Sequence, residues 1–398
     1  MAMLPVEIKS VIIDCMANFT GDPFVGIALV WPDVLFRIRE HRFHTVVLLT
    51  AFRARRLLDL LQTSPSIASV VRTLAVENFH VVDTPDVNLP RSLAMMNNIT
   101  SVKFFNIPCH NGRAMKSFDA LPSSVVNVHL HFLCINEMHQ EVPLRIDHLF
   151  DTLQSFPNVQ KLGFNFTRSS TTNFVQSRVQ LPHIRVLSLG GDVLSESSFI
   201  SSFLARAALP SLSSLYIEEL HQITPLIPML HCWGATLKEL HVPNHDLLRD
   251  TLSTINTAFT LPGGIEAVEF HIRISDDPQE EYYLHAWANA LEKHGQSTAS
   301  HLRRLTISKL EFPWPDAQDI RLYSEALLRF DFVLGTGALA VKHLDWCMCA
   351  RGGSLEGDSD EPFKWVNGAI FPIVRWRFLS ENSEAKFRTT STISKVFE

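Results

Sequence analysis

The residues that most resemble a metal centre are a histidine and two cysteines near the C-terminal end. His343, Cys347 and Cys349 offer imidazole and thiol groups, which zinc accepts as ligands. In an extended segment these three residues share one face. A structural zinc ion needs four ligands at characteristic spacing, however, and the sequence has no second ligand pair nearby. The pattern therefore predicts a strand, and we expect no metal ion and no cofactor.

Motifs for nucleophilic or phosphate chemistry are missing from the sequence. The segment Gly352-Gly353-Ser354-Leu355-Glu356 begins like a G-x-S-x-G nucleophile elbow but lacks the closing glycine. Neither G-x-x-x-x-G-K-[ST] nor G-x-G-x-x-G occurs, so no phosphate-cradling loop is indicated. Catalysis needs a nucleophile, a base and an orienting group, or a metal set. We therefore expect that the chain is not an enzyme, and an enzyme on an α/β scaffold is the least favoured interpretation.

One apolar pattern, Φ-x-x-Φ-x-Φ with Φ an apolar residue, recurs through most of the chain. Its last two apolar positions alternate, as in a strand with one buried face. Segments with helical spacing, such as Ile200/Phe203/Ala207, lie between several copies. Repetition of a strand and a helix predicts parallel strands stacked side by side with helices behind them; a generic α/β domain is the alternative. The copies begin at Val71, Ile99, Val125, Val159, Ile184, Leu212, Leu237, Ile265, Leu302 and Val341.

This pattern resembles a leucine-rich-repeat solenoid over about residues 66–350. The resemblance implies an α/β fold in which parallel β-strands line the concave side and helices cover the convex side. The Asn or Cys that usually follows the last apolar position of each repeat is replaced in most copies, for example by Phe79, Ile107 and Leu133. We therefore expect an irregular leucine-rich-repeat solenoid.

Residues that alternate with the apolar positions would line the concave face of such a solenoid. Small residues, including Gly163, Ser188 and Gly190, occupy its middle, and aromatic and ionisable residues flank them. A shallow floor with such walls suits a protein or peptide better than a deep catalytic pocket does. The acidic residues favour a basic segment in the partner; an ordinary solvated sheet face is the alternative. The predicted client-binding face consists of His129, His131, Asn165, Tyr216, Glu218, Glu239, His241, Glu269 and His271.

The first fifty residues precede the repeat and predict three short helices followed by an extended run at 45–49. They resemble an F-box in Leu4-Pro5-x-Glu7-Ile8, in Ala28-Leu29-Val30 and in the exit Arg42-Phe43-His44-Thr45-Val46. The resemblance implies docking on the Skp-type adaptor of a cullin ubiquitin ligase. A helical cap over the first repeat is a compatible alternative. The implied adaptor-binding residues are Leu4, Pro5, Ile8, Ile12, Ile13, Val30 and Leu35.

The order of these segments resembles the F-box and leucine-rich-repeat proteins that are abundant in mushroom-forming fungi. The resemblance implies a substrate-recognition subunit of an SCF-type cullin ubiquitin ligase, in which the solenoid binds a client protein. The alternative is a non-catalytic interaction scaffold without a link to ubiquitin ligases. We expect an F-box-like helical module at 1–50, a solenoid at 51–378 and a polar tail at 379–398.

Composition limits the remaining possibilities. Hydrophobic residues make up 46% and charged residues 19% of the 398 residues, which excludes a mainly disordered chain. The 35 Lys and Arg against 41 Asp and Glu do not fit a strongly basic nucleic-acid binder. No apolar run approaches the ~20 residues that span a bilayer, and no signal peptide is visible. We expect a cytoplasmic or nuclear protein with protein partners, and neither nucleic acid nor membrane as partner.

Overall fold

The computed structural model divides into two compact units, Met1–Val175 and Gln176–Glu398, which are treated separately below. It describes residues 4–16, 27, 30–79, 89–108, 118–133, 144–145, 153–154, 156–167, 171–172, 179–191, 197–218, 223–242, 259–273, 278–297, 301–313, 325–335, 339, 341, 343–351 and 386–393.

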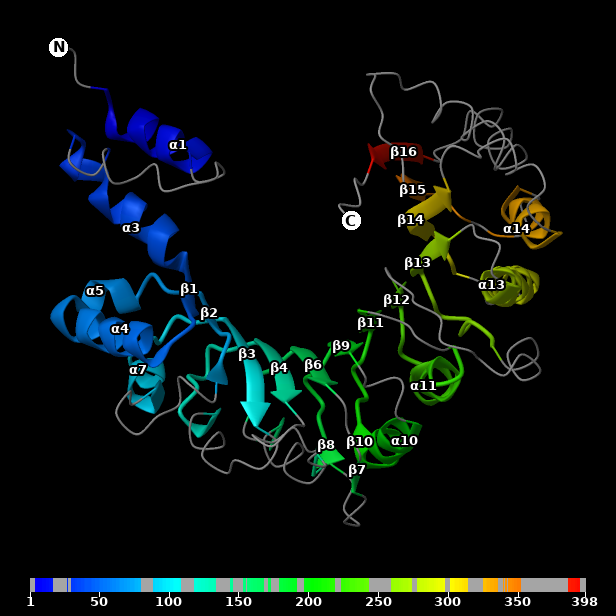
Figure 1. Ribbon diagram of the computed structural model, residues 1–398, viewed down its shortest axis with the longest axis horizontal. Coiled ribbons are helices and arrows are strands. Elements are labelled where there is room, and N and C mark those ends of the chain that lie inside the picture. The colour runs from blue at the N-terminus through cyan, green and yellow to red at the C-terminus, as the bar shows by residue number, and fades with distance from the viewer. Residues whose placement is uncertain are drawn as a thin grey trace. The chain divides into compact units, whose positions relative to one another are not determined.

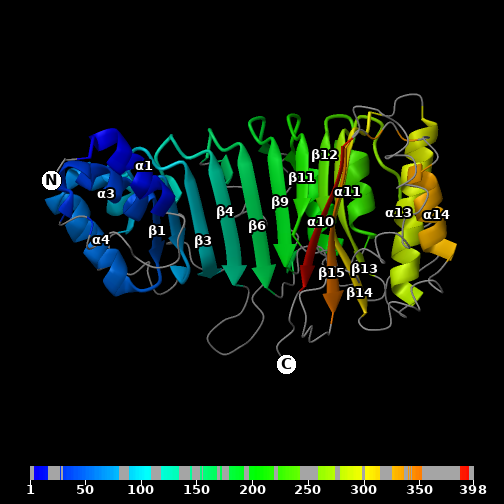
Figure 2. The same ribbon diagram turned by 90° about the horizontal axis from the view of Figure 1, so that it is seen from above.

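The first unit contains parallel strands that follow one another in chain order (Figure 2). The second apolar position of each repeat lies in register with the next, as Leu74, Val102, Val128 and Leu162 show. These four side chains are at most 1% exposed, so the repeat pattern builds one continuous core row. The strands are β1 (Thr45–Leu48), β2 (Thr73–Val76), β3 (Ser101–Pro108), β4 (Asn127–Leu133) and β6 (Lys161–Thr167); β5 (Leu144–Arg145) pairs separately with β7 (Thr171–Thr172).

Helices precede and flank these strands. The clearest amphipathic helix is α4. Thr50 caps its N-terminus by accepting a hydrogen bond from the Arg53 amide. Its Leu57 and Leu61 are buried, while Arg55 and Arg56 are exposed. A solvated basic face opposite an apolar face is the arrangement that the amphipathic spacing implies. The helices are α1 (Val6–Met16), the 3₁₀ turn η1 (Pro32–Val34), α3 (Leu35–His44), α4 (Ala51–Thr63), α5 (Pro65–Ala68) and α7 (Leu89–Met95).

The second unit repeats the same plan with parallel strands in chain order. Leu187, Leu215, Leu240, Val268 and Leu305 lie in register across its first five strands, and each is at most 1% exposed. The strands are β9 (Val186–Gly191), β11 (Ser214–Ile217), β12 (Glu239–Val242), β13 (Ala267–Arg273), β14 (Arg304–Pro313), β15 (His343–Arg351) and β16 (Lys386–Ile393); β8 (Val179–Gln180) pairs separately with β10 (Ala207–Ala208).

The described helices of the second unit lie on one side of these strands (Figure 1). On α13, Trp287 is fully buried and stacks on Phe270 of β13, with ring centroids 4.5 Å apart. Phe259 meets the same indole edge-on at 5.1 Å, so an aromatic cluster joins helix to strand. The helices are α10 (Ser197–Arg206), α11 (Leu226–Trp233), α13 (Pro278–Gln296) and α14 (Glu325–Gly335).

The predicted repeat is confirmed as a mixed α/β arrangement of parallel strands with helices on one side. The first apolar residue of every copy is at most 6% exposed. Within each unit, the neighbours of a strand follow the order of the chain, as stacked repeats require, without the order reversal of a doubly wound sheet.

Two segments differ from the expected domain bounds. Residues 45–48, placed in the N-terminal module, form β1 and pair with β2 in the sheet. Residues 386–393, expected to lie in a polar tail, form β16 and pair with β15. Residues 386–393 are rich in polar residues, so their pairing depends on a neighbouring strand edge that local sequence does not reveal.

Candidate binding face

The strands of the second unit have one face that points away from helices α10, α11, α13 and α14, and we call it the open face (Figure 1). Because side chains alternate along a strand, the residues next to the buried leucines point to this face. Ser188, Tyr216, His241 and Glu269 occupy equivalent positions on β9, β11, β12 and β13 and lie in register. One row across four strands therefore carries much of the predicted client-binding face.

Tyr216 and His241 form a stacked pair at the centre of this row. Their ring centroids are 4.1 Å apart and the ring planes differ by 1°. The Nδ1–H of His241 donates to Glu269 Oε2 at 2.8 Å, while its Nε2 lies 3.7 Å from Glu239 Oε2. The imidazole is thus held between two carboxylates and against one phenol ring, which leaves it little rotational freedom.

Serine hydroxyls fix two carboxylates on the same face, those of Glu218 and Glu239. Ser188 Oγ donates to Glu218 Oε1 at 3.0 Å, and Ser214 Oγ donates to Glu239 Oε2 at 2.8 Å. Ser214 and Glu239 lie opposite each other on β11 and β12. These hydrogen bonds favour one orientation of each carboxylate, so the acidic groups are positioned before any ligand arrives.

The electrostatic character of the open face is negative around Tyr216. Burial raises the pKa of the Tyr216 phenol above its ordinary value, and the charges of Glu239 and Glu269 raise it further. Tyr216 therefore remains a neutral phenol at physiological pH. Strands β9, β11 and β12, all of them described, contain no Lys or Arg to offset these glutamates. A cationic group is the natural complement of such a face.

His271 differs from the other predicted residues of this face, because it is only 4% exposed. It lies directly after a register shift between β13 and β14, where Phe270 pairs with Ile307 and His271 pairs with Lys309. The strict alternation that placed His271 on the surface does not account for this irregularity. Its side chain offers almost no surface to a client in this structure.

The remaining predicted face residues belong to the first unit. His129 and His131 on β4 both contact Phe105 of β3, with ring centroids 5.7 and 6.2 Å apart. His129 lies in register with Gly163, and His131 with Asn165. A Cβ atom on Gly163 would stand 2.3 Å from His129 Nδ1, so the missing side chain makes room for the imidazole.

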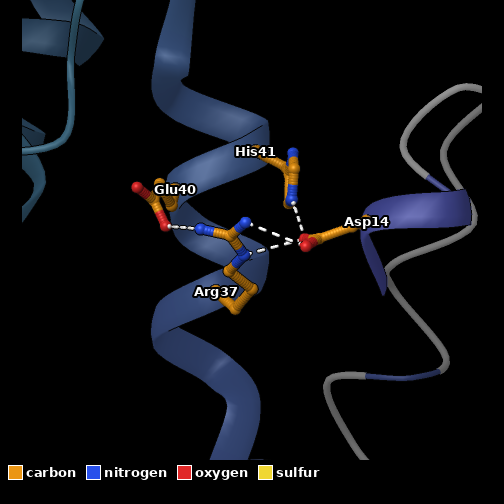
Figure 3. A network of polar contacts seen from close by, with 4 residues as sticks. All are labelled: Asp14, Arg37, Glu40 and His41. Carbon is orange, nitrogen blue, oxygen red and sulfur yellow. Dashed lines mark hydrogen bonds and ion pairs between the residues drawn. The ribbon is translucent and has the colours of Figure 1, made fainter. Parts of the chain in front are cut away.

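The N-terminal helices of the first unit form a small module with its own core of Ile13, Val34 and Ile38. Asp14 on α1 ties α1 to α3 (Figure 3). Arg37 donates to both carboxylate oxygens of Asp14, at 2.8 and 2.9 Å, and His41 Nε2 donates to one of them at 2.7 Å. These bonds, those of Arg37 first, lower the pKa of Asp14 to about 2.

A buried lysine provides a second link within this module. Lys9 is 6% exposed, and its Nζ contacts Asp33 Oδ2 at 2.6 Å. The ammonium also lies 5.9 Å from the centre of the Trp31 ring. The hydrogen bond from Lys9 lowers the pKa of Asp33. Burial of Lys9 inside the module turns the apolar residues on the other side of α1 toward solvent.

Most of the predicted adaptor-binding residues are accessible. Leu4, Ile8 and Val30 are 44%, 49% and 71% exposed, and Pro5 is exposed as well. Ile12 and Leu35 are half-buried. Ile13 is fully buried against Val34 and Ile38, so its side chain belongs to the module's core and presents no contact surface.

Val11 is a further residue of this surface, because it is 58% exposed and follows Ile8 by three positions on α1. Ile8 and Val11 on α1, together with Leu4 two residues before the helix begins, are exposed apolar residues, and we call these three residues the α1 stripe. The spacing i, i+4, i+7 of these three residues was the sequence signal that could have identified Val11. The same apolar spacing, however, is also typical of helices that face a core. Val30 is a separate exposed apolar residue of the same module.

Other predicted sites can be located in part. Residues 343–349 lie on β15, as the extended pattern predicts. Among the described residues, no group of three or more His, Cys, Asp or Glu side chains is arranged to hold a metal ion. None of the described helices is both long and apolar enough to cross a membrane.

Known proteins similar to this chain are found among solved structures. No family model matches the chain, and no curated protein matches it either. A solved structure similar to this chain is the leucine-rich repeat-containing protein LegL7 from Legionella pneumophila. The two share 14% identical residues, the match covers 82% of this chain and 98% of that chain, and the TM-score is 0.44. Function is therefore inferred from this chain's own side chains.

Proposed function

We propose that the chain is a non-catalytic solenoid of the leucine-rich-repeat type that binds a basic segment of a client protein on the open face of its second unit. The observation that carries this proposal is the set of carboxylates around the Tyr216–His241 stack. Glu218, Glu239 and Glu269 are held by hydrogen bonds, and strands β9, β11 and β12 contain no Lys or Arg.

A protein segment suits this face better than a small molecule does. Neighbouring strands lie about 4.8 Å apart, so the row from Ser188 to Glu269 extends over several strands. Its side chains are half-buried, and none of these four is a large apolar residue. Aromatic groups within a polar rim are typical anchors of protein interfaces.

The test is affinity capture of clients from cell extract during proteasome inhibition. We expect the chain to capture a defined set of proteins, and we expect Tyr216→Ala/Glu218→Ala and Glu239→Gln/Glu269→Gln to lose that set. The matched control is Glu292→Gln, which removes an acidic group on α13 that pairs with Arg329 away from the row. Thermal unfolding must show that all variants fold. Unchanged capture by both double variants would refute client binding on the open face.

We further propose that the N-terminal module docks on the Skp-type adaptor of a cullin ligase, which would make the chain the substrate-recognition subunit of that ligase. The specific observation is the α1 stripe, whose three side chains are 44–58% exposed on α1 and immediately before it. Exposed apolar side chains at helical spacing are typical of helix-docking surfaces. The resemblance of Leu4-Pro5-x-Glu7-Ile8 to an F-box supports the identity of the partner.

Co-expression of the chain with a Skp-type adaptor tests this second proposal. We expect the two proteins to co-purify, and we expect Leu4→Asp/Ile8→Asp to abolish the complex because a charge would be buried at the interface. Phe52→Asp is the control, since Phe52 is a 64% exposed apolar residue on α4. If the intact chain does not bind the adaptor, the alternative holds, namely an interaction scaffold whose N-terminal helices serve only as a cap.

A further inference from the structure

The ring of Tyr216 has a second face whose surroundings differ from those of the face on His241. Tyr216 and His241 are directly opposite on neighbouring strands, and their rings are parallel at 4.1 Å. Neighbouring strands are about 4.8 Å apart, which is close to the ring separation. The two rings are therefore stacked along the direction that leads from one strand to the next. The second face of the Tyr216 ring is therefore turned toward β9, on the other side of β11.

Strand β9 places a small residue directly opposite this ring face, and Val186, two positions earlier with the same orientation, lies opposite Ser214. Ser188 is the residue of β9 that lies in register with Tyr216. The next residue of β9 with the same orientation is Gly190, which has no side chain. A single serine hydroxyl is thus the floor of a slot beside the ring, and we define the Tyr216 slot by Ser188, Tyr216 and Glu218.

Glu218 supplies the charge of this slot. It follows Tyr216 by two positions, so its side chain emerges on the same face. Its Oε1 accepts the hydrogen bond from Ser188 Oγ at 3.0 Å, which draws the carboxylate over β9 and toward the exposed side of the ring. The slot therefore combines a flat aromatic wall with a carboxylate at its side, and both are held in place by neighbours.

We propose that the Tyr216 slot binds the guanidinium group of an arginine in the client's basic segment, in preference to a lysine. A guanidinium is planar, stacks on an aromatic face and directs N–H donors sideways to a carboxylate. An ammonium is a compact, strongly hydrated charge that cannot stack in this way. The inference rests on the proposed client-binding function and specifies the residue type that the client must present.

The raised pKa of Tyr216 is consistent with this role, because burial and the charges of Glu239 and Glu269 keep the ring a neutral phenol. The stack also gives His241 a role in positioning the Tyr216 ring. By filling the β12 side, the imidazole keeps the Tyr216 ring upright, so that the ring cannot fold over toward Glu239. His241 is in this sense a positioning residue for the slot.

Two fluorescent peptides of equal length test the proposal with the full chain. Both contain Gly-Ser spacers, which separate arginines in one peptide and lysines in the other, and fluorescence anisotropy gives each Kd at low salt. We expect the arginine peptide to bind about fivefold more tightly, the size of a partly exposed cation–π contact. Tyr216→Leu should remove this preference, whereas Tyr216→Phe should keep it because the π-face remains.

Each outcome separates the residue preference from the proposed function. Equal binding of the two peptides by the intact chain overturns the arginine slot but leaves a basic-segment face in place. A preference that persists in Tyr216→Leu also overturns the slot. If neither peptide binds, the proposed recognition of basic segments fails together with the slot. Glu292→Gln is the control for a general loss of negative charge and should bind both peptides like the intact chain.

Discussion

Single residues decide how closely neighbouring strands can bring their side chains together. Gly163 is the clearest case, because the imidazole of His129 occupies the position that any Cβ on residue 163 would need. The 2.3 Å separation from His129 Nδ1 is far below an ordinary van der Waals contact. A larger residue would therefore force the histidine away from Phe105, its aromatic neighbour on β3.

We predict that Gly163→Ala destabilises the chain by about 1 kcal/mol, because the imidazole must rotate out of its present position. His129→Ala should relieve this conflict, so the double variant should be less destabilised than the sum of the two single variants. Urea denaturation of all four proteins measures the coupling. Additive effects would show that the imidazole does not obstruct residue 163.

Asp14 gives a second residue-scale prediction, which concerns acid stability. Its pKa is about 2 in the folded chain against an ordinary value of 3.8, so its contacts stabilise the fold above pH 4. This contribution is lost as the pH falls from about 4 toward 2. Because the side chain is 41% exposed, solvent screening limits the contribution to less than about 1 kcal/mol.

Hydrogen exchange of the α1 amides checks this prediction. Asp14→Asn should open α1 more often than the intact chain does near neutral pH, and the difference should shrink between pH 4 and pH 2. Asp59→Asn on α4 is the control, because Asp59 is an exposed carboxylate outside the module. A difference that stayed constant down to pH 2 would contradict the role of the Asp14 charge.

At the scale of elements, the helices hold the strands through a few large side chains. Trp287 is the main example, since its indole contacts Phe270 on β13 and Phe259 in the loop before that strand. Tyr283, one helical turn earlier, meets the same ring at 6.2 Å. The position of α13 against the sheet therefore depends on one aromatic cluster.

We expect Trp287→Ala to lower the free energy of unfolding by about 3–5 kcal/mol, through lost burial and the cavity that remains. Lys293→Ala, an exposed position on the same helix, should change it by less than about 0.5 kcal/mol. Urea denaturation followed by tryptophan fluorescence and circular dichroism measures both. A small effect of Trp287→Ala would mean that the helix is held by other contacts.

The start of α13 combines dense negative charge with signals that favour a helix start. The acidic run from Ser275 to Glu281 is typical of a surface loop, yet Pro278 begins a helix of 19 residues. Proline in a first turn and carboxylates near a helix N-terminus both favour that helix start.

At the scale of the whole molecule, the net negative charge favours a partner with a positively charged segment. The chain carries a net charge of −6, and part of the acidic excess lies beside Tyr216 on the open face. Association with a basic segment should therefore be fast and sensitive to ionic strength.

We predict that the arginine peptide binds more weakly as salt rises, with most of the loss complete when the Debye length falls below about 8 Å near 0.15 M. Anisotropy titrations across a salt series measure this dependence. Glu239→Gln/Glu269→Gln should flatten the dependence as well as weaken binding. An affinity independent of salt would indicate that apolar contacts, and not the glutamates, hold the peptide.

The sequence by itself determined which residues are buried in each repeat and the order of the strands. Hydrophobic alternation is a local property, so Leu187, Leu215 and Leu240 could be aligned before any contact was known. The same alignment placed Tyr216, His241 and Glu269 in one row. It could not show that two rings stack or that Ser188 holds Glu218, because rotamers depend on neighbours from other strands.

Only the tertiary structure decided which side of α1 faces inward and where alternation fails. Ile8 and Ile13 have the same chemistry, but Lys9 pairs with Asp33 and enters the module beside Ile13, which leaves Ile8 in solvent. His271 is buried at a register shift that depends on the partner strand β14. The periodicity of a sequence indicates which positions are buried on average. Packing against particular neighbours decides which individual side chains stay exposed to a partner.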